Sequence, residues 1–174
     1  MDTLRYPIGQ FITLQEPTNE QRNQFIESIA GMPAKLRQAV EGLVLEQLNT
    51  PYRPGGWTLQ QVVHHLADAK MNAYIRFKRG LTEEHPVAGT FREELWAQLN
   101  DYKDTPVETS ILLIEALHSR FVTLLLKLLP TDFKRVVTSP TYGDMTLDTA
   151  VQRYSWHAYH HIAQITSLRE HMGW

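Results

Sequence analysis

The chain of 174 residues contains no cysteine. This absence excludes disulfide bonds, zinc sites built on thiolates and a cysteine nucleophile, and it suits a reducing cytosol. The sequence does contain eight histidines. Neutral imidazole is a good ligand for zinc, nickel, cobalt and copper, so the histidines are the first candidates for a site that binds such a metal.

A long apolar run and a dominant charge are also missing. The most hydrophobic stretch, residues 111–129, is broken by Glu115, Arg120 and Lys127, so we expect no membrane span. The first residues lack the apolar run of a secretion signal. The formal net charge of −2 and the scattered basic residues give no reason to expect a nucleic-acid partner. We therefore expect a cytoplasmic protein that binds neither membranes nor nucleic acid.

Three segments begin with a threonine that is followed three residues later by glutamine or glutamate. This spacing is typical of a capping box, in which the threonine hydroxyl accepts a hydrogen bond from an unpaired backbone N–H of the first helical turn. The three pairs are Thr18–Gln21, Thr58–Gln61 and Thr105–Glu108. They predict three helix starts, and Pro106 suits the first position of the last of these helices because it has no N–H to lose.

Hydrophobic periodicity predicts four long helices, over about residues 19–48, 58–81, 106–129 and 147–171. The first should be interrupted at Gly31-Met32-Pro33, where Pro33 should either begin a second helix or leave a kink. A short helix near residues 91–99 and a small β-hairpin, formed by residues 133–138 and 145–147, complete the prediction. The sequence therefore predicts an all-α protein, a four-helix bundle in one domain that spans residues 1–174.

Three of the eight histidines lie within five residues, His157 to His161. On the last predicted helix, His157 and His161 project from the same face, one turn apart. Two imidazoles at this spacing can bind one metal ion, and a third from another helix would leave one coordination position open for chemistry. His65 lies on a polar stripe of the second helix, whereas His64 points about a quarter-turn away. His65 is therefore the better third ligand.

Polar residues that could support these histidines lie further along the same helices. Asp68 follows His65 by one turn, and Gln164 follows His161 by one turn. Hydrogen bonds from such neighbours usually fix the tautomer and orientation of ligating imidazoles. The polar stripe of the second helix continues with Asn72 and Arg76, which are candidates for a substrate pocket. For Arg76, an ordinary salt bridge is the competing interpretation.

Two elements of the sequence resemble the DinB superfamily. They are Gly56-Trp57-Thr58 with the following His64-His65-Leu66-Ala67-Asp68, and the run from Trp156 to Ile165. The similarity covers nearly the whole chain and is greatest to the YfiT-like branch, whose members are described as metal-dependent hydrolases. The resemblance implies an up-down-down-up bundle, a homodimer, and one zinc or nickel ion held by His65, His157 and His161. His64 and His160 would then be structural or support the ligands, unless one of them replaces a ligand.

A three-histidine site with an open position is compatible with more than one function. It can lower the pKa of a bound water to about 7 and deliver hydroxide to an ester, amide or phosphate of a small-molecule substrate. It can also present a thiol as the nucleophile, because some members of the superfamily resemble thiol S-transferases that use bacillithiol. If His64 or His160 were a fourth ligand, the metal would only staple two helices together. We take hydrolysis as the leading hypothesis and thiol transfer as its close alternative.

The hydrolase hypothesis leaves the general base unassigned. Metal-dependent hydrolases commonly place a glutamate beside the ligating histidines, but the residue after His157 is Ala158. Asp68 could serve if its helix turn faces the metal. Alternatively, the loop after the second helix could bring in Glu83 or Glu84.

Overall fold

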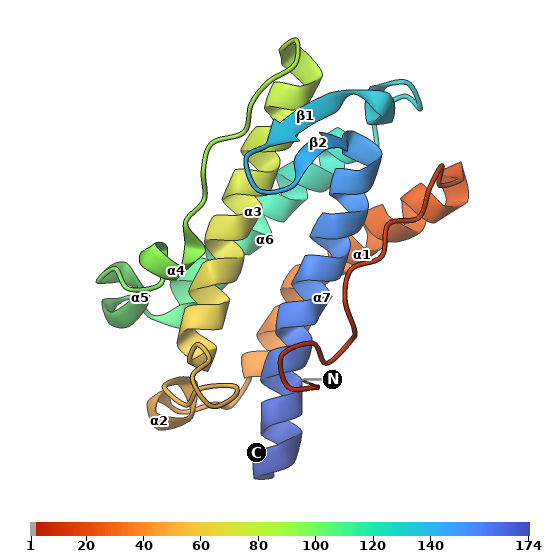
Figure 1. The fold of residues 1–174 in the computed structure, drawn as a ribbon. Helices are drawn as coiled ribbons and strands as arrows, with labels where there is room; N and C mark the ends of the chain where they lie inside the picture. The colour runs from red at the N-terminus through yellow and green to blue at the C-terminus, as the bar shows by residue number, and fades with distance from the viewer. Residues whose placement is uncertain (1–2) are drawn as a thin grey trace.

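The computed structural model describes residues 3–174. Four long helices form a bundle (Figure 1): α1 (Asn19–Val40), α3 (Leu59–Thr82), α6 (Val107–Leu125) and α7 (Leu147–Met172). The connections contain three short helices, α2 (Leu45–Leu48), α4 (Glu93–Trp96) and α5 (Asp101–Asp104), and a 3-10 turn, η1 (Asp132–Lys134). An antiparallel hairpin of β1 (Val136–Ser139) and β2 (Gly143–Thr146) precedes α7. The predicted bundle and hairpin are confirmed.

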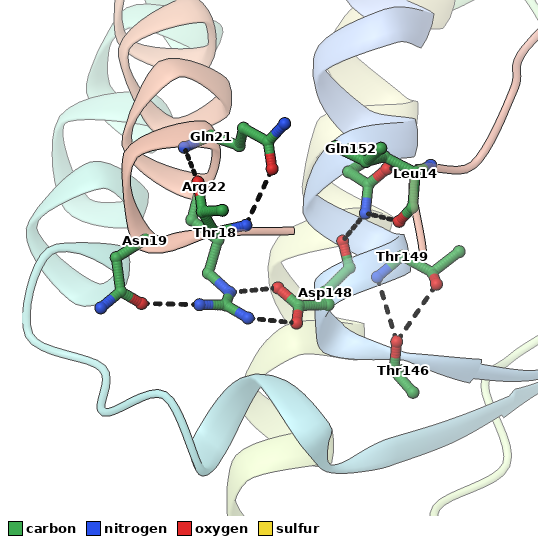
Figure 2. A network of polar contacts seen from close by, with 9 residues as sticks. All are labelled: Leu14, Thr18, Asn19, Gln21, Arg22, Thr146, Asp148, Thr149 and Gln152. Atoms are coloured by element: carbon green, nitrogen blue, oxygen red, sulfur yellow. Dashed lines mark hydrogen bonds and ion pairs between the residues drawn. The ribbon is translucent and has the colours of Figure 1, made fainter. Parts of the chain in front are cut away.

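Contacts at both ends of α1 and α7 show that these two helices are parallel. Near their first residues, the Arg22 guanidinium binds the Asp148 carboxylate, with Nε and Oδ1 2.6 Å apart (Figure 2). At their other ends, Arg169 donates a hydrogen bond to the carbonyl oxygen of Ala39 at 2.8 Å. We call residues 3–18, which precede α1, the N-terminal segment. It lies along α7, where the Gln152 side chain forms two hydrogen bonds with the backbone of Leu14.

The other two helices run in the opposite direction, so the order is up-down-down-up. α3 and α6 are parallel, because His64 near the start of α3 contacts Ser110 near the start of α6 at 2.7 Å. α6 is antiparallel to α1, because Glu108 in its first turn binds Arg37 in the last turn of α1. Two parallel neighbours cannot be joined by a tight turn, so residues 83–106 cross back along the bundle. We call residues 83–106 the crossover segment.

Two of the three predicted capping boxes are present, at Thr18 and Thr58. The third prediction is wrong, because α6 begins one residue later, with Pro106 as its N-cap and no side-chain cap. The glutamate needed for this box has another partner: both carboxylate oxygens of Glu108 accept hydrogen bonds from Arg37. A contact between distant segments therefore replaces the local one.

The prediction that a second helix begins at Pro33 is also wrong, because α1 continues through this residue to Val40. A proline inside a helix costs about 3 kcal/mol. The surrounding residues Ile29, Met32 and Leu36 are each 2% exposed or less. Burying such side chains contributes roughly 1.5–3 kcal/mol each, which outweighs the local penalty. The chain leaves the helix at the C-cap Glu41 instead, and the next residue, Gly42, has a φ of +76° that favours glycine.

The crossover segment is held against the bundle by hydrogen bonds to its backbone. The Gln60 side chain on α3 donates to the carbonyl oxygens of Tyr102 and Lys103, both at 3.0 Å. The neighbouring Gln61 donates to the carbonyl oxygen of Ala97 at 2.8 Å. These contacts fix α4 and α5 beside the first turns of α3. Among the helices of residues 3–174, none is both long and apolar enough to cross a membrane.

A buried histidine on α6 makes the bundle sensitive to acid. His118 is 2% exposed, and its Nδ1 donates a hydrogen bond to the carbonyl oxygen of Ile29 at 2.8 Å. Its other nitrogen, Nε2, is buried without a hydrogen-bond partner among the described residues. Burial lowers the pKa of His118 to about 4. The folded protein therefore keeps this ring neutral at a pH where the unfolded chain protonates it.

We expect His118→Leu to reduce the loss of stability in acid. Below pH 6.5 the unfolded chain binds a proton at His118 and the folded chain does not. Between this pH and about pH 4, this residue therefore lowers the free energy of unfolding of the wild type by roughly 1.4 kcal/mol per pH unit. Urea denaturation of both proteins between pH 4 and 7 measures the difference in free energy of unfolding. The free energy of unfolding of the variant should rise relative to that of the wild type as the pH falls. If the difference between the two free energies of unfolding does not change with pH, the lowered pKa of His118 is contradicted.

Candidate metal centre

Three histidines meet where α3 packs against α7. His65 lies in the second turn of α3, and His157 and His161 lie one turn apart on α7. The Nε2 atoms of His65 and His157 are 3.2 Å apart. One nitrogen from each of the three rings lies within 4.8 Å of the other two. Nitrogens bound at 2.0–2.1 Å to a tetrahedral ion are about 3.3 Å apart, so the cluster fits a single transition-metal ion.

Burial keeps all three imidazoles neutral at physiological pH. His65 is 1% exposed and His161 is 8% exposed. Burial lowers the pKa of His65 to about 3. It also lowers the pKa of His157 and His161 well below the usual value, and repulsion among the rings adds to this effect. Metals bind the neutral form of histidine, and this is the form that the three rings favour.

Gln164 fixes the orientation of His161. Nδ1 of His161 donates a hydrogen bond to Oε1 of Gln164 at 2.8 Å, which leaves Nε2 of the ring without its proton. The amide nitrogen of Gln164 donates to the carbonyl oxygen of Arg5 and to Nε2 of His160, both at 3.0 Å. The structure therefore places Gln164 in contact with both histidines and ties them to the N-terminal segment.

The two neighbouring histidines are engaged elsewhere. Nε2 of His64 donates to the carbonyl oxygen of Thr105 at 3.1 Å, so its Nδ1 accepts a hydrogen bond from the Ser110 hydroxyl. His160 accepts from Gln164 and stacks on Trp156, with ring centroids 4.7 Å apart. Neither ring belongs to the three-histidine cluster.

Asp68 does not support His65 as predicted. Its Oδ2 accepts a hydrogen bond of 2.6 Å from the Tyr102 hydroxyl of α5. Nδ1 of His65 is buried and has no hydrogen-bond partner among the described residues. Aromatic rings pack on His65 instead. Trp57 lies 4.7 Å from it between centroids, and Phe91 of the crossover segment stacks nearly parallel at 5.7 Å.

The crossover segment also supplies a carboxylate that the sequence analysis missed. Oε2 of Glu93, in the first turn of α4, lies 3.9 Å from Nε2 of His65. Burial raises the pKa of Glu93, with repulsion from Glu94 adding to the effect. Of the two glutamates considered beforehand, Glu83 forms an ion pair with Arg79 on the protein surface. At 1.5 Å per residue, this end of α3 is about 27 Å from His65.

A cleft runs past the cluster. It consists of two adjoining hollows of about 290 and 410 Å³, which meet at His157, Glu93 and Arg153. The smaller hollow extends between α3, α7 and the hairpin, and the candidate pocket residues Asn72 and Arg76 line it. The larger one extends toward the N-terminal segment, along His160 and His161 and other residues. Hollows of this size suit a small molecule.

Comparisons with known proteins agree with this geometry. The sequence profile of the DinB superfamily matches residues 28–165. Two relatives, from Bacillus mycoides strain KBAB4 and Bacillus cereus strain AH820, are each named "putative metal-dependent hydrolase". Both are 45% identical to this chain over 174 residues, which is 100% of either protein. A solved structure, "YfiT from Bacillus subtilis is a probable metal-dependent hydrolase with an unusual four-helix bundle topology", matches with a TM-score of 0.96 and 46% identity over 99% of both chains. The chain therefore belongs to the DinB superfamily and to its YfiT-like branch.

Proposed function

We propose that this protein is a metal-dependent hydrolase whose metal is held by His65, His157 and His161. The observation that carries the proposal is the convergence of three neutral imidazoles, two buried and one half-buried, beside an open cleft. The names of the relatives support it. A divalent ion such as zinc or nickel, bound by three histidines with one position open, supplies a water of pKa about 7 and polarises the bond to be hydrolysed.

Glu93 is the residue to which we assign the role of general base. The 3.9 Å between its Oε2 and Nε2 of His65 exceeds hydrogen-bond length and leaves Oε2 available to a water beside the cluster. The raised pKa of this carboxyl group makes it a stronger base than an exposed glutamate. Oε2 would accept a proton from the attacking water and then donate it to the leaving group.

The other functions considered from the sequence are less well supported. A closed structural site needs a fourth ligand, but His64 binds Ser110 and His160 binds Gln164. Thiol transfer needs no carboxylate base, since the metal alone stabilises a thiolate. It would therefore leave the position of Glu93 without a role.

Removal and return of the metal test the proposed function. Protein without a purification tag should hold about one equivalent of zinc or nickel and hydrolyse activated aryl esters. Chelation should reduce the rate to the uncatalysed background, and added metal should restore both the rate and the melting temperature, because a ligand present at 100 times its Kd stabilises the native state by about 2.7 kcal/mol. A rate that depends on added thiol would indicate transfer instead. Full activity after complete chelation would contradict the proposal.

A further inference from the structure

The smaller hollow contains positively charged side chains that hydrolysis itself does not use. Four cationic residues line it, and one of them, Arg92, comes from the crossover segment. The long helices supply Lys70 and Arg76 from α3 and Arg153 from α7, together with the polar side chains of Asn72 and Tyr154. We call these five residues the cationic arm. The carboxylates of Glu93 and Glu94 line the same hollow; Glu93 is the one near the cluster. The hollow therefore contains charged groups of both signs.

Arg76 has a guanidinium whose charge is not neutralised. Within residues 3–174 it forms no ion pair, so the salt bridge considered from the sequence is not seen. Its Nη2 donates a long hydrogen bond of 3.5 Å to the carbonyl oxygen of Gly89. The Arg76 guanidinium also lies close enough to Tyr154 to lower the pKa of its hydroxyl, against the larger opposite effect of burial. Its Nε is buried without a partner among the described residues. An unpaired buried donor costs about 1–3 kcal/mol, and an anion in the hollow would supply the missing acceptor.

Lys70 adds a second incompletely paired cation. It is 3% exposed, and its Nζ donates one hydrogen bond, of 2.8 Å, to the carbonyl oxygen of Tyr154. An ammonium group has three donors, and no carboxylate of the described residues forms an ion pair with this one. Burial lowers the pKa of Lys70 to about 7. A neighbouring anion would favour its charged form.

Arg153 lies where the two hollows meet. Its guanidinium carbon is 3.7 Å from the ring centroid of Tyr142 and 5.3 Å from that of Phe11. Stacking on ring faces leaves the N–H groups at the edge of a guanidinium for a ligand. In the part of the chain that the structure describes, no ion pair involves Arg153.

We propose that the cationic arm binds an anionic group of the substrate, a carboxylate or a phosphate, while the bond to be hydrolysed lies at the three-histidine cluster. The inference rests on the proposed function and narrows it to anionic substrates. Lys70 is about 8 Å and Arg76 about 16 Å along α3 from His65, at 1.5 Å per residue. Side chains on a helix lean toward its N-terminus, which on α3 is the end nearer His65. An anion about 8 Å from the reacting bond, the length of a substituted benzene ring, fits this arrangement.

Calorimetry with matched probes tests the cationic arm without relying on turnover. The probes are 4-hydroxybenzoate, phenyl phosphate and the neutral isostere 4-hydroxybenzamide, titrated into both zinc-loaded and chelated protein. We expect one of the anions to bind at least tenfold more tightly than the amide in both forms. Arg76→Gln and Arg153→Gln, on separate helices, should each remove most of that preference. Arg79→Gln should not, because Arg79 lies on α3 but binds Glu83 at the surface. The anion that binds with the lower Kd shows whether the cationic arm prefers a carboxylate or a phosphate.

Three results would overturn the inference: equal affinities for anions and amide, a preference that disappears on chelation, or a preference that both variants retain. In the second case the anion would be bound to the metal. Hydrolysis of 4-acetoxybenzoate and 4-acetoxybenzamide separates this question from the proposed function. Metal-dependent hydrolysis of both esters at equal kcat/KM, with equal binding, would refute the cationic arm alone. Tight, Arg76-dependent binding of an anion without hydrolysis of any ester would refute the proposed function alone.

Discussion

Replacing His157 or His161 with alanine should reduce the metal content from about one equivalent per chain to nearly none, and His65→Ala should do the same. Each variant removes one of three ligands from a cluster whose nitrogens lie within 4.8 Å of one another, and the neighbouring rings of His64 and His160 are hydrogen-bonded to Ser110 and Gln164. The several kcal/mol that a Lewis-acidic ion contributes to the transition state correspond to a loss of roughly 10³-fold in kcat/KM. Elemental mass spectrometry and ester hydrolysis measure the two effects.

Two controls accompany the ligand variants. His171→Ala removes an exposed histidine from the last turn of the same helix and should change neither metal content nor rate. His160→Gln tests whether a ligand can be exchanged. Since His160 contacts Gln164 rather than the cluster, we expect the metal to stay bound, with affinity reduced by no more than about 10–100-fold. Retention of a full equivalent by His157→Ala would refute the assigned ligand set.

Glu93→Gln should lower kcat by about 10²–10⁴-fold, the usual contribution of a general base, and leave the metal content unchanged. The substitution keeps the size of the side chain and removes its ability to accept a proton. Burial raises the pKa of this carboxyl group, so the acidic limb of the wild-type pH–rate profile should reflect a group that titrates above an ordinary glutamate. That limb should disappear in the variant.

The matched control for Glu93 is its neighbour. Glu94→Gln changes the charge of the same hollow by the same amount, but no contact of Glu94 with the cluster is seen in residues 3–174. It should retain most of the wild-type rate. A Glu93→Gln variant that loses its metal would identify Glu93 as a ligand, and one that keeps the full rate would exclude it as the base.

The helix starts were predictable where the signal is local. Thr18 and Thr58 each bond a glutamine three residues away, so the sequence alone contains the whole interaction. The signals at Pro33 and Glu108 failed because distant residues decide the outcome. Packing against other helices keeps α1 continuous, and Arg37 of α1 takes the carboxylate of α6.

The same distinction holds for the candidate site. His157, His161 and Gln164 belong to one helix, where spacing determines which side chains meet. Asp68 had a suitable spacing too, but Tyr102 from another helix takes its carboxylate. The position of Glu93 near the cluster could not be predicted from the sequence, because Glu93 lies in an irregular connection and no helical spacing relates it to the three histidines. Its position depends on side chains of α3 that bind the backbone of the crossover segment.

The parallel arrangement of α3 and α6 has a consequence for how such a site can diversify. In a bundle with alternating helix directions, short hairpin loops would join all neighbours, and no chain would run beside the metal. Here residues 83–106 run back along α3 (Figure 1). They bring Phe91 and Glu93 to the cluster on the way. Loops tolerate substitution and insertion far better than packed helices. Selection or protein engineering could therefore change the crossover segment around Phe91, and with it the surroundings of the cluster, while the ligands and the cationic arm stay fixed in α3 and α7.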